Sequence, residues 1–408
     1  MGIFLKLAWR NLFRNKRRTM LASLAIGIGL AALIFTDALI IGMEENMIRS
    51  ATASFMGEGQ IHREGFARTM EVGQTIHRPD TVLSMLSKEE IVKQYSPRTM
   101  SMGMITSPAN VTSVNIVGID PETEHHLSQI DEALQRGEYF SGDNPRDIVI
   151  GSKLADMLEA DIGDRIVLTA SEAGTGDLAQ DMFRISGIYR FGIREMDQGM
   201  AFIRIEKAQE MLGLNNGIHE IAIDFGPTGI GQQSEHPFWD TYSQFGNIAE
   251  GWIQIQPELA TYMELSQYST YIIGVILFGV VALGIINTLF MSLHERMFEF
   301  GVLRAVGTRP FAMGRLIVME AGALAVISIG VGTVLGFLIT YITTVTGIDY
   351  TGLEFLGVTI RELIYPDMEV RQFIEFPILV FLFTTLVGIY PAWYAGRMEP
   401  ADALRKSF

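Results

Sequence analysis

The chain has 408 residues and a mass of 45.3 kDa, which exceeds the ~100–200 residues of one ordinary soluble domain. Only 19% of the residues are charged, 48% are hydrophobic and the mean hydropathy is +0.25, a balance that excludes a disordered or fibrous chain and favours a membrane protein. Cysteine is absent, which excludes disulfide scaffolds, cysteine-ligated metal sites and a thiol nucleophile. The net charge of −15 argues against a nucleic-acid partner.

Four apolar stretches are each long enough to form a membrane-spanning helix, which needs about 20 mostly apolar residues. The expected spans are residues 19–43, 269–293, 315–345 and 373–395. The first could instead be a cleaved signal peptide, but its apolar run exceeds the ~7–15 residues of such a segment. Buried core helices are the alternative for all four. Their length and their near lack of charge favour four transmembrane helices.

Basic residues are concentrated on one side of these spans. They are Lys6, Arg10, Arg14, Lys16, Arg17 and Arg18 before the first span, Arg296, Arg304, Arg309 and Arg315 between the second and third, and Arg397, Arg405 and Lys406 after the fourth. Because segments rich in Lys and Arg stay in the cytoplasm, we expect residues 294–314, residues 396–408 and both termini there. Residues 44–268, which carry an excess of acidic side chains, and the short loop 346–372 are expected on the opposite side.

The long segment 44–268 has the pattern of an α+β domain. Strand-like stretches lie at 114–119, 147–150, 165–170, 182–189, 200–205 and 220–225. Short helices are expected after Ser152, which can cap the first of them, and from Ile205 or Glu206. Residues 171–180 and 226–236 look like loops, and residues 43–53 and 259–267 look like helical stalks that continue the adjacent spans. The pattern predicts one or two α+β subdomains outside the membrane.

Residues 1–18 predict an amphipathic helix. Its apolar residues Phe4, Ala8, Leu12 and Phe13 fall near one face, and its basic residues Lys6, Arg10 and Arg14 recur every four residues on another. We expect this helix in the cytoplasmic interface, with its apolar face in lipid and its cations near anionic headgroups. A plain positively charged anchor is the alternative.

Some polar and small residues within the spans need an explanation. Asp37, Glu320 and Glu375 lie near span ends, where each could reach the headgroups or have a functional role that the sequence leaves open. Small residues favour close helix packing, as in the G-x-x-x-G of Gly332 and Gly336. Outside the spans, His125 and His126 look like an exposed loop, because adjacent residues do not face one another and form a poor metal site.

The motifs of nucleotide-binding loops, zinc proteases and serine hydrolases are absent (G-x-x-x-x-G-K-[ST], H-E-x-x-H and G-x-S-x-G). The segment HERMFEFGVLRAVGTRPFAMGRLIVMEA, His294–Ala321, instead resembles the ER-x-x-E-x-G-x-L-R-A-x-G segment of ABC-transporter permeases in the MacB/FtsX/Lol superfamily. The chain end YPAWYAGRMEPADALR, Tyr390–Arg405, and the start LAWRNLFRNKRRT, Leu7–Thr19, resemble the same family. The stretches GEGQIHREGF, Gly57–Phe66, and VNIVGIDPETE, Val114–Glu124, look closest to the lipoprotein-releasing members.

The resemblance implies four membrane helices, an extracytoplasmic domain between the first two, and residence in a bacterial inner membrane. It implies no catalytic, cofactor or metal site in this chain, with ATP and Mg²⁺ bound by a separate ABC ATPase subunit. Contact with that ATPase is expected from the stretch 295–306, read as a short two-sided apolar helix that Gly307 stops. The expected coupling residues are Glu295, Phe298, Glu299, Gly301, Leu303, Arg304 and Gly307.

The function implied by the resemblance is extraction of lipoproteins from the outer leaflet of the inner membrane for a periplasmic carrier, by a dimer with a second permease copy or a paralogue. The acyl chains would pass a cavity lined by Ala25, Gly29, Ala32, Ile276 and Val280, although helix packing explains the small residues equally well. The alternatives are mechanotransmission for a tripartite drug or peptide exporter, and an FtsX-like regulator of wall hydrolases.

Overall fold

The computed structural model describes residues 2–397 apart from 141, 143, 227, 352–353, 356–357 and 360–362. Most of the expected cytoplasmic tail (residues 398–408), and with it Arg405 and Lys406, therefore lies outside the described residues, as does part of the expected loop 346–372. The chain divides into two compact units. One contains residues 1–45, 263–349 and 363–408, and the other contains residues 46–262 and 350–362.

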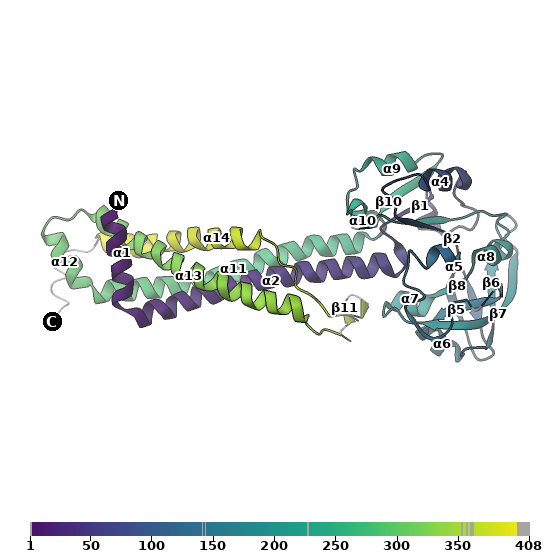
Figure 1. Cartoon of the computed structure of the whole chain (residues 1–408), viewed down its shortest axis with the longest axis horizontal. Coiled ribbons are helices and arrows are strands. Elements are labelled where there is room, and N and C mark those ends of the chain that lie inside the picture. The colour runs from purple at the N-terminus through teal and green to yellow at the C-terminus, as the bar shows by residue number, and fades with distance from the viewer. Residues whose placement is uncertain are drawn as a thin grey trace. The chain divides into compact units, whose positions relative to one another are not determined.

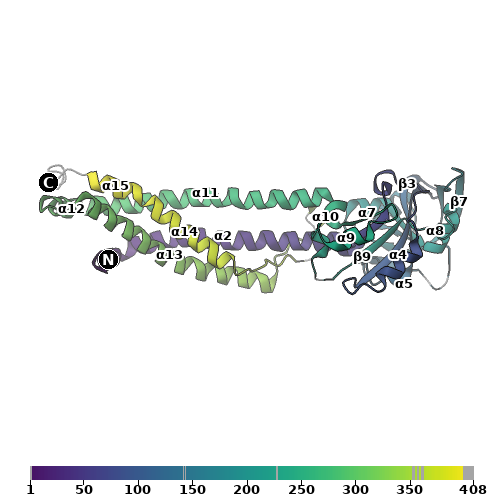
Figure 2. The same ribbon diagram turned by 90° about the horizontal axis from the view of Figure 1, so that it is seen from above.

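The first unit is a bundle of helices. These are α1 (Gly2–Arg14), α2 (Lys16–Ala51), α11 (Pro257–Glu295), α12 (Met297–Ala305), α13 (Pro310–Thr346), α14 (Gln372–Val387) and α15 (Ile389–Arg397). Within the described part of the chain, four stretches are long and apolar enough to cross a membrane, namely Lys16–Met56, Pro257–Glu295, Pro310–Thr346 and Gln372–Arg397. The long helices lie alongside one another, and α1 runs across them at the end where α12 and α15 also lie (Figures 1 and 2).

Small residues bring α2 and α13 into close contact. A Cβ added at Gly332 would lie 2.7 Å from the carbonyl oxygen of Gly27, and one at Gly336 would lie 3.2 Å from Cα of Ala31. The G-x-x-x-G of α13 is thus a packing face, because only glycine permits this approach of two backbones.

Helix α1 packs on protein through part of its apolar face, and the expectation that this face lies in lipid was wrong in that respect. Ala8 is fully buried with Met313 and Ile317 of α13, and Leu12 is buried with Ile26 of α2. Phe13 remains 45% exposed. The helix therefore belongs to the bundle on one face and leaves another face free.

The second unit is an α+β domain. Its strands are β1 (Gly59–Arg63), β2 (Gln94–Thr106), β3 (Val111–Ile119), β4 (Leu134–Gly137), β5 (Asp147–Gly151), β6 (Arg165–Ser171), β7 (Leu178–Tyr189), β8 (Met200–Arg204), β9 (Glu220–Asp224), β10 (Asn247–Gly251), β11 (Glu354–Phe355) and β12 (Val358–Thr359). Its helices are η1 (Thr52–Met56), α3 (Phe66–Thr69), α4 (Pro79–Leu86), α5 (Pro121–Glu124), α6 (Ser152–Leu158), α7 (Arg194–Gly199), α8 (Ile205–Leu212), η2 (Ile230–Gln232), α9 (Pro237–Tyr242) and α10 (Trp252–Ile255).

Strands β1 to β10 form a single sheet with the order β10-β1-β9-β2-β3-β8-β5-β7-β4, in which β6 pairs with β2 and β7. Most pairs are antiparallel, whereas β3 with β8 and β5 with β7 are parallel. All six strands expected from the sequence are present, and all six belong to this sheet. The expected loop 171–180 is shorter, because β6 extends to Ser171 and pairs there with Leu178. The expected cap is also wrong: α6 begins after Gly151, and no side chain caps it.

Candidate functional site

The segment after α11 folds as a short helix held between two turns. Helix α11 ends at Glu295, Arg296 leaves the helical conformation with φ −110°, and α12 runs from Met297 to Ala305. Gly307 has φ +101°, a conformation that glycine tolerates far better than other residues. Pro310 then occupies the first turn of α13, where its missing N–H costs nothing. The expected stop at Gly307 is present, and the helix is shorter than the predicted 295–306.

A buried ion pair anchors this segment to α13. Nη1 of Arg296 lies 2.6 Å from Oε1 of Glu320, and the two side chains are 9% and 6% exposed. Nδ2 of Asn11 donates a hydrogen bond of 2.7 Å to the same carboxylate oxygen. Glu320 therefore does not simply reach the headgroups, as the sequence had allowed, but joins three helices through one carboxylate.

Two further ion pairs join this region to the start of the chain. Arg14 contacts Glu299 at 2.7 Å, and Arg18 contacts Glu295 at 2.6 Å. Glu299 also accepts a hydrogen bond of 3.1 Å from Nε of Arg296. Partial burial alone would raise the pKa of Glu299, but the hydrogen bonds from Arg14 and Arg296 outweigh it and lower the pKa. The carboxylate is thus charged and shared between α1 and α12.

Helix α12 has one buried and one exposed apolar side. Phe300 is 1% exposed in a cluster with Met313, Leu316 and Ala395, and Gly301 is buried beside it. The exposed apolar face consists of Phe298, Val302, Leu303 and Val306, which are 52%, 40%, 43% and 82% exposed. Arg304 lies half-buried between these sides. A helix held by ion pairs at its start thus presents apolar side chains that the described residues leave uncovered.

Of the residues expected to line a lipid cavity, some pack against a neighbouring helix and others are exposed. A Cβ added at Gly29 would lie 2.9 Å from Cγ2 of Val281, so Gly29 permits close contact of α2 with α11. Ala25 is exposed and Ala32 is half-buried. Ile276 and Val280 of α11 are 61% and 65% exposed. The single chain thus leaves Ala25, Ile276 and Val280 open on α2 and α11.

The remaining two intramembrane carboxylates share one cation. Oδ2 of Asp37, a residue that is 6% exposed, lies 3.5 Å from Nη2 of Arg371, and Oε2 of Glu375 lies 3.3 Å from Nη1 of the same side chain. This pairing was not foreseen, because the sequence separates Asp37 from its partner by most of the chain.

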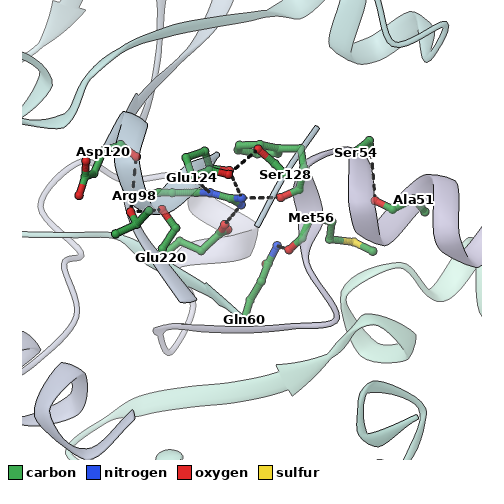
Figure 3. A network of polar contacts seen from close by, with 12 residues as sticks. Ala51, Ser54, Met56, Gln60, Arg98, Asp120, Glu124, Ser128 and Glu220 are labelled. Atoms are coloured by element: carbon green, nitrogen blue, oxygen red, sulfur yellow. Dashed lines mark hydrogen bonds and ion pairs between the residues drawn. The ribbon is translucent and has the colours of Figure 1, made fainter. Parts of the chain in front are cut away.

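In the α+β domain, a fully buried arginine anchors the helical segment that continues α2. Nη2 and Nε of Arg98 donate hydrogen bonds of 2.6 and 3.0 Å to Glu124, and Nη1 donates one of 2.8 Å to Glu220 (Figure 3). The guanidinium carbon lies 3.8 Å from the ring centroid of Phe55 in η1, and Nη2 also donates to the carbonyl oxygen of Phe55. Arg98 was not predicted from the sequence, because β2, the strand that carries it, was not predicted either, and an arginine is usually exposed.

The two chain segments that enter and leave this domain meet on neighbouring strands. Gly59 of β1 pairs with Gly251 of β10, and the amide of Trp252 donates a hydrogen bond of 3.0 Å to the carbonyl oxygen of Glu58. Along the chain α2 continues through η1 into β1, and β10 continues through α10 into α11, so both chain segments join the domain at neighbouring strands. Among the described residues, no group of three or more His, Asp or Glu side chains could hold a metal ion; His125 contacts Asp131 instead.

Comparison with known proteins identifies both units. A model of the MacB-like periplasmic core domain matches residues 19–228, and a model of the FtsX-like permease C-terminal region matches residues 271–400. The chain is 22% identical to a lipoprotein-releasing system transmembrane protein LolC of Xylella fastidiosa, with 96% of both chains covered. It is also 22% identical to LolE of Haemophilus influenzae, with 98% of both covered.

A longer relative shares the same two units. The macrolide export ATP-binding/permease protein MacB of Bdellovibrio bacteriovorus is 25% identical over 97% of this chain, which covers 60% of that protein. Because the MacB-like model alone spans more than half of the sequence, the chain belongs to the family of ABC-transporter permeases that combine a MacB-like periplasmic core domain with an FtsX-like permease region.

Proposed function

We propose that this chain is the permease subunit of an ABC transporter whose separate ATPase subunit docks on α12. The exposed apolar face of α12 carries the proposal, because Arg296, Glu299 and Phe300 hold the helix in place while Phe298 and Leu303 remain open. An exposed apolar face on a helix marks a surface for another protein, because such a face docks into an apolar groove through side chains at helical spacing. ATP and Mg²⁺ would be bound by the ATPase and not by this chain.

The proposed substrate is a lipoprotein, extracted from the outer leaflet of a bacterial inner membrane and passed to a periplasmic carrier. The relatives LolC and LolE, which are named as parts of a lipoprotein-releasing system, align over nearly the whole chain. In this arrangement both termini and α12 face the cytoplasm, and the α+β domain faces the periplasm. A second copy or a paralogue would cover the open faces of α2 and α11 at Ala25, Ile276 and Val280.

Force would pass from α12 through the bundle to the domain. Glu320 links α12 to α13, α13 packs on α2 at Gly27, and the continuation of α2 is fixed to the sheet by Arg98. ATP-driven closure of two permeases could thereby displace acyl chains from between their helices and move the periplasmic domain. The substrate need not cross the membrane.

The test is reconstitution with the ATPase that co-purifies from native membranes. We expect ATP to release a lipidated protein from proteoliposomes to a soluble carrier, and we expect ADP to release none. An unlipidated form of the same protein should neither be released nor stimulate hydrolysis. Export of a macrolide without lipoprotein release would contradict the proposed substrate and favour an exporter. Hydrolysis of ATP by the permease alone would contradict the proposed division of labour.

A further inference from the structure

An open groove runs between α1 and the span helices α13 and α14. It has a volume of about 1410 Å³, larger than the roughly 300–1,000 Å³ of ordinary small-molecule sites. Apolar side chains form most of its walls, among them Trp9 and Phe13 from α1, Met319 and Val326 from α13, and Phe381 from α14. Since the α13 and α14 residues lie in membrane-spanning stretches, the occupant must be compatible with lipid.

The side of the groove that α1 forms is strongly basic. The charged residues that line it are Lys6, Arg10 and Arg14, and no carboxylate is found among its described lining residues. Arg14 is engaged by Glu299, whereas Lys6 and Arg10 are exposed and have no ion-pair partner within the described part of the chain. Two uncompensated cations at the rim of an apolar groove are complementary to an anionic headgroup attached to an acyl chain.

The floor of the groove is kept open by a glycine. A Cβ added at Gly322 would lie 3.8 Å from Oγ1 of Thr385 and 3.9 Å from the ring of Phe381. This is ordinary contact distance, so a larger side chain at Gly322 would extend into the groove without disturbing the helix backbone. On α1, Trp9 is 46% exposed and its ring centroid lies 5.4 Å from that of Phe13; tryptophan, whose ring is apolar apart from one N–H, is enriched at membrane interfaces.

We propose that this groove binds an anionic phospholipid of the cytoplasmic leaflet, with the headgroup phosphate at Lys6 and Arg10 and an acyl chain along Gly322 and Phe381. The occupant is a lipid of the surrounding membrane and not the transported substrate, so the inference does not depend on the proposed lipoprotein. Its effect on the transporter follows from geometry: α1 holds Glu320 through Asn11 and Glu299 through Arg14. Lipid binding therefore stabilises the anchors of α12.

The test uses Trp9 as the reporter. The full chain carrying Trp393→Phe is placed in phosphatidylcholine nanodiscs in which the fraction of brominated lipid is varied, the brominated lipid being either phosphatidylglycerol or phosphatidylcholine. The only other tryptophans, Trp239 and Trp252, are buried in the α+β domain and give a constant background. We expect brominated phosphatidylglycerol to quench Trp9 fluorescence at a lower lipid fraction than brominated phosphatidylcholine.

Variants distinguish specific binding of the lipid in the groove from general attraction of anionic lipid to basic residues on the protein surface. Removing both cations with Lys6→Gln and Arg10→Gln should raise the required lipid fraction by roughly 25-fold, since each cation contributes about fivefold. The matched control Lys16→Gln with Arg17→Gln removes the same charge from exposed positions outside the groove and should leave quenching unchanged. Gly322→Leu should abolish the preference while retaining all cations. Equal quenching by the two brominated lipids in the parent, or equal effects of the two double variants, would overturn the proposal.

Discussion

Arg296 and Glu320 form a buried ion pair, with 2.6 Å between Nη1 and Oε1, that ties the start of α12 to the third membrane helix. A buried pair of this kind contributes little net stability compared with apolar residues, but removal of one partner leaves an uncompensated charge. The pair therefore acts chiefly to fix the position of α12, as the proposed contact with an ATPase subunit would require.

Replacing Glu320 by Gln should destabilise the bundle by about 3–5 kcal/mol, because Arg296 would lose its buried counter-charge. The apparent melting temperature of the purified chain in nanodiscs measures this loss. Glu375→Gln is the control, since Glu375 is half-exposed and should change stability by at most about 0.5 kcal/mol. The pair Arg296→Met with Glu320→Met should recover most of the stability. A Glu320→Gln variant as stable as the parent would show that the ion pair does not hold α12.

Removing Arg98, which pairs with two buried carboxylates, should destabilise the α+β domain as removing Glu320 destabilises the bundle. Arg98→Met leaves Glu124 and Glu220 buried beside an apolar side chain, so we expect the free energy of unfolding to fall by about 3–5 kcal/mol. Unfolding is monitored by the fluorescence of Trp239 and Trp252. Arg136→Met removes an exposed pair in which Arg136 and Asp161 are 55% and 61% exposed, so it should cost at most about 1 kcal/mol. Equal losses in the two variants would contradict the special role of Arg98.

His62 and His219 should make the stability of the α+β domain depend on pH in opposite directions. His219 accepts a hydrogen bond from the amide of Met100 at Nδ1 and faces the carbonyl oxygen of Val72 at Nε2, an arrangement that suits only the neutral ring. Burial lowers the pKa of His219 despite the bond to Val72. For His62, burial would lower the pKa, but the contacts with Glu250 and the carbonyl of Arg63 outweigh it and raise the pKa.

The signs follow from proton uptake by the unfolded chain, in which histidine titrates near about pH 6.5. The stability associated with neutral His219 is present above that pH and is lost as the pH falls through the lowered pKa. The contribution of His62 is complete below that pH and is lost as the pH rises through the raised pKa. His62→Gln should therefore cost more stability at pH 5.5 than at pH 9, and His219→Gln should cost less at pH 5.5 than at pH 9. Unfolding curves of each variant at pH 5.5 and pH 9 measure these losses of stability. A larger loss at pH 9 for His62→Gln, or at pH 5.5 for His219→Gln, would contradict the prediction.

The membrane orientation can be tested with single cysteines, because the chain contains none. Thr175→Cys, in an exposed turn of the α+β domain, should react with an impermeant thiol reagent in intact spheroplasts. Asn15→Cys, exposed between α1 and α2, should react only after permeabilisation. The opposite labelling pattern would place the α+β domain in the cytoplasm and contradict the orientation.

The sequence predicted what depends on local pattern. Apolar length located the spans, and the expected helical stalks 43–53 and 259–267 are present as the continuation of α2 to Ala51 and the first part of α11. Alternation located six strands, but β1, β2, β4 and β10 were missed. In β2 the reason is that Pro97 lies within the strand and its first residues, 94–99, are mostly polar. Sequence patterns could not predict the contacts of the site, because the contacting residues lie far apart in the chain. Asn11 and Glu320, for example, are 309 positions apart. The one available signal was Glu320 itself, a carboxylate within an apolar helix that requires a partner.

The central claim is that α12 is the contact with the ATPase. It is tested most directly by removing apolar side chains from the exposed face of α12. Phe298→Ala with Leu303→Ala removes two anchors from the exposed apolar face, and each such truncation typically costs about 1–2 kcal/mol or more. Leu178→Ala is the control, because Leu178 is an equally apolar residue, 72% exposed, in the α+β domain. We predict that the double variant inserts and folds normally, binds its ATPase at least tenfold more weakly or hydrolyses ATP without releasing substrate, and that the control behaves like the parent. Assembly and substrate release by the double variant at the parent's level would contradict the assignment of α12 as the ATPase contact.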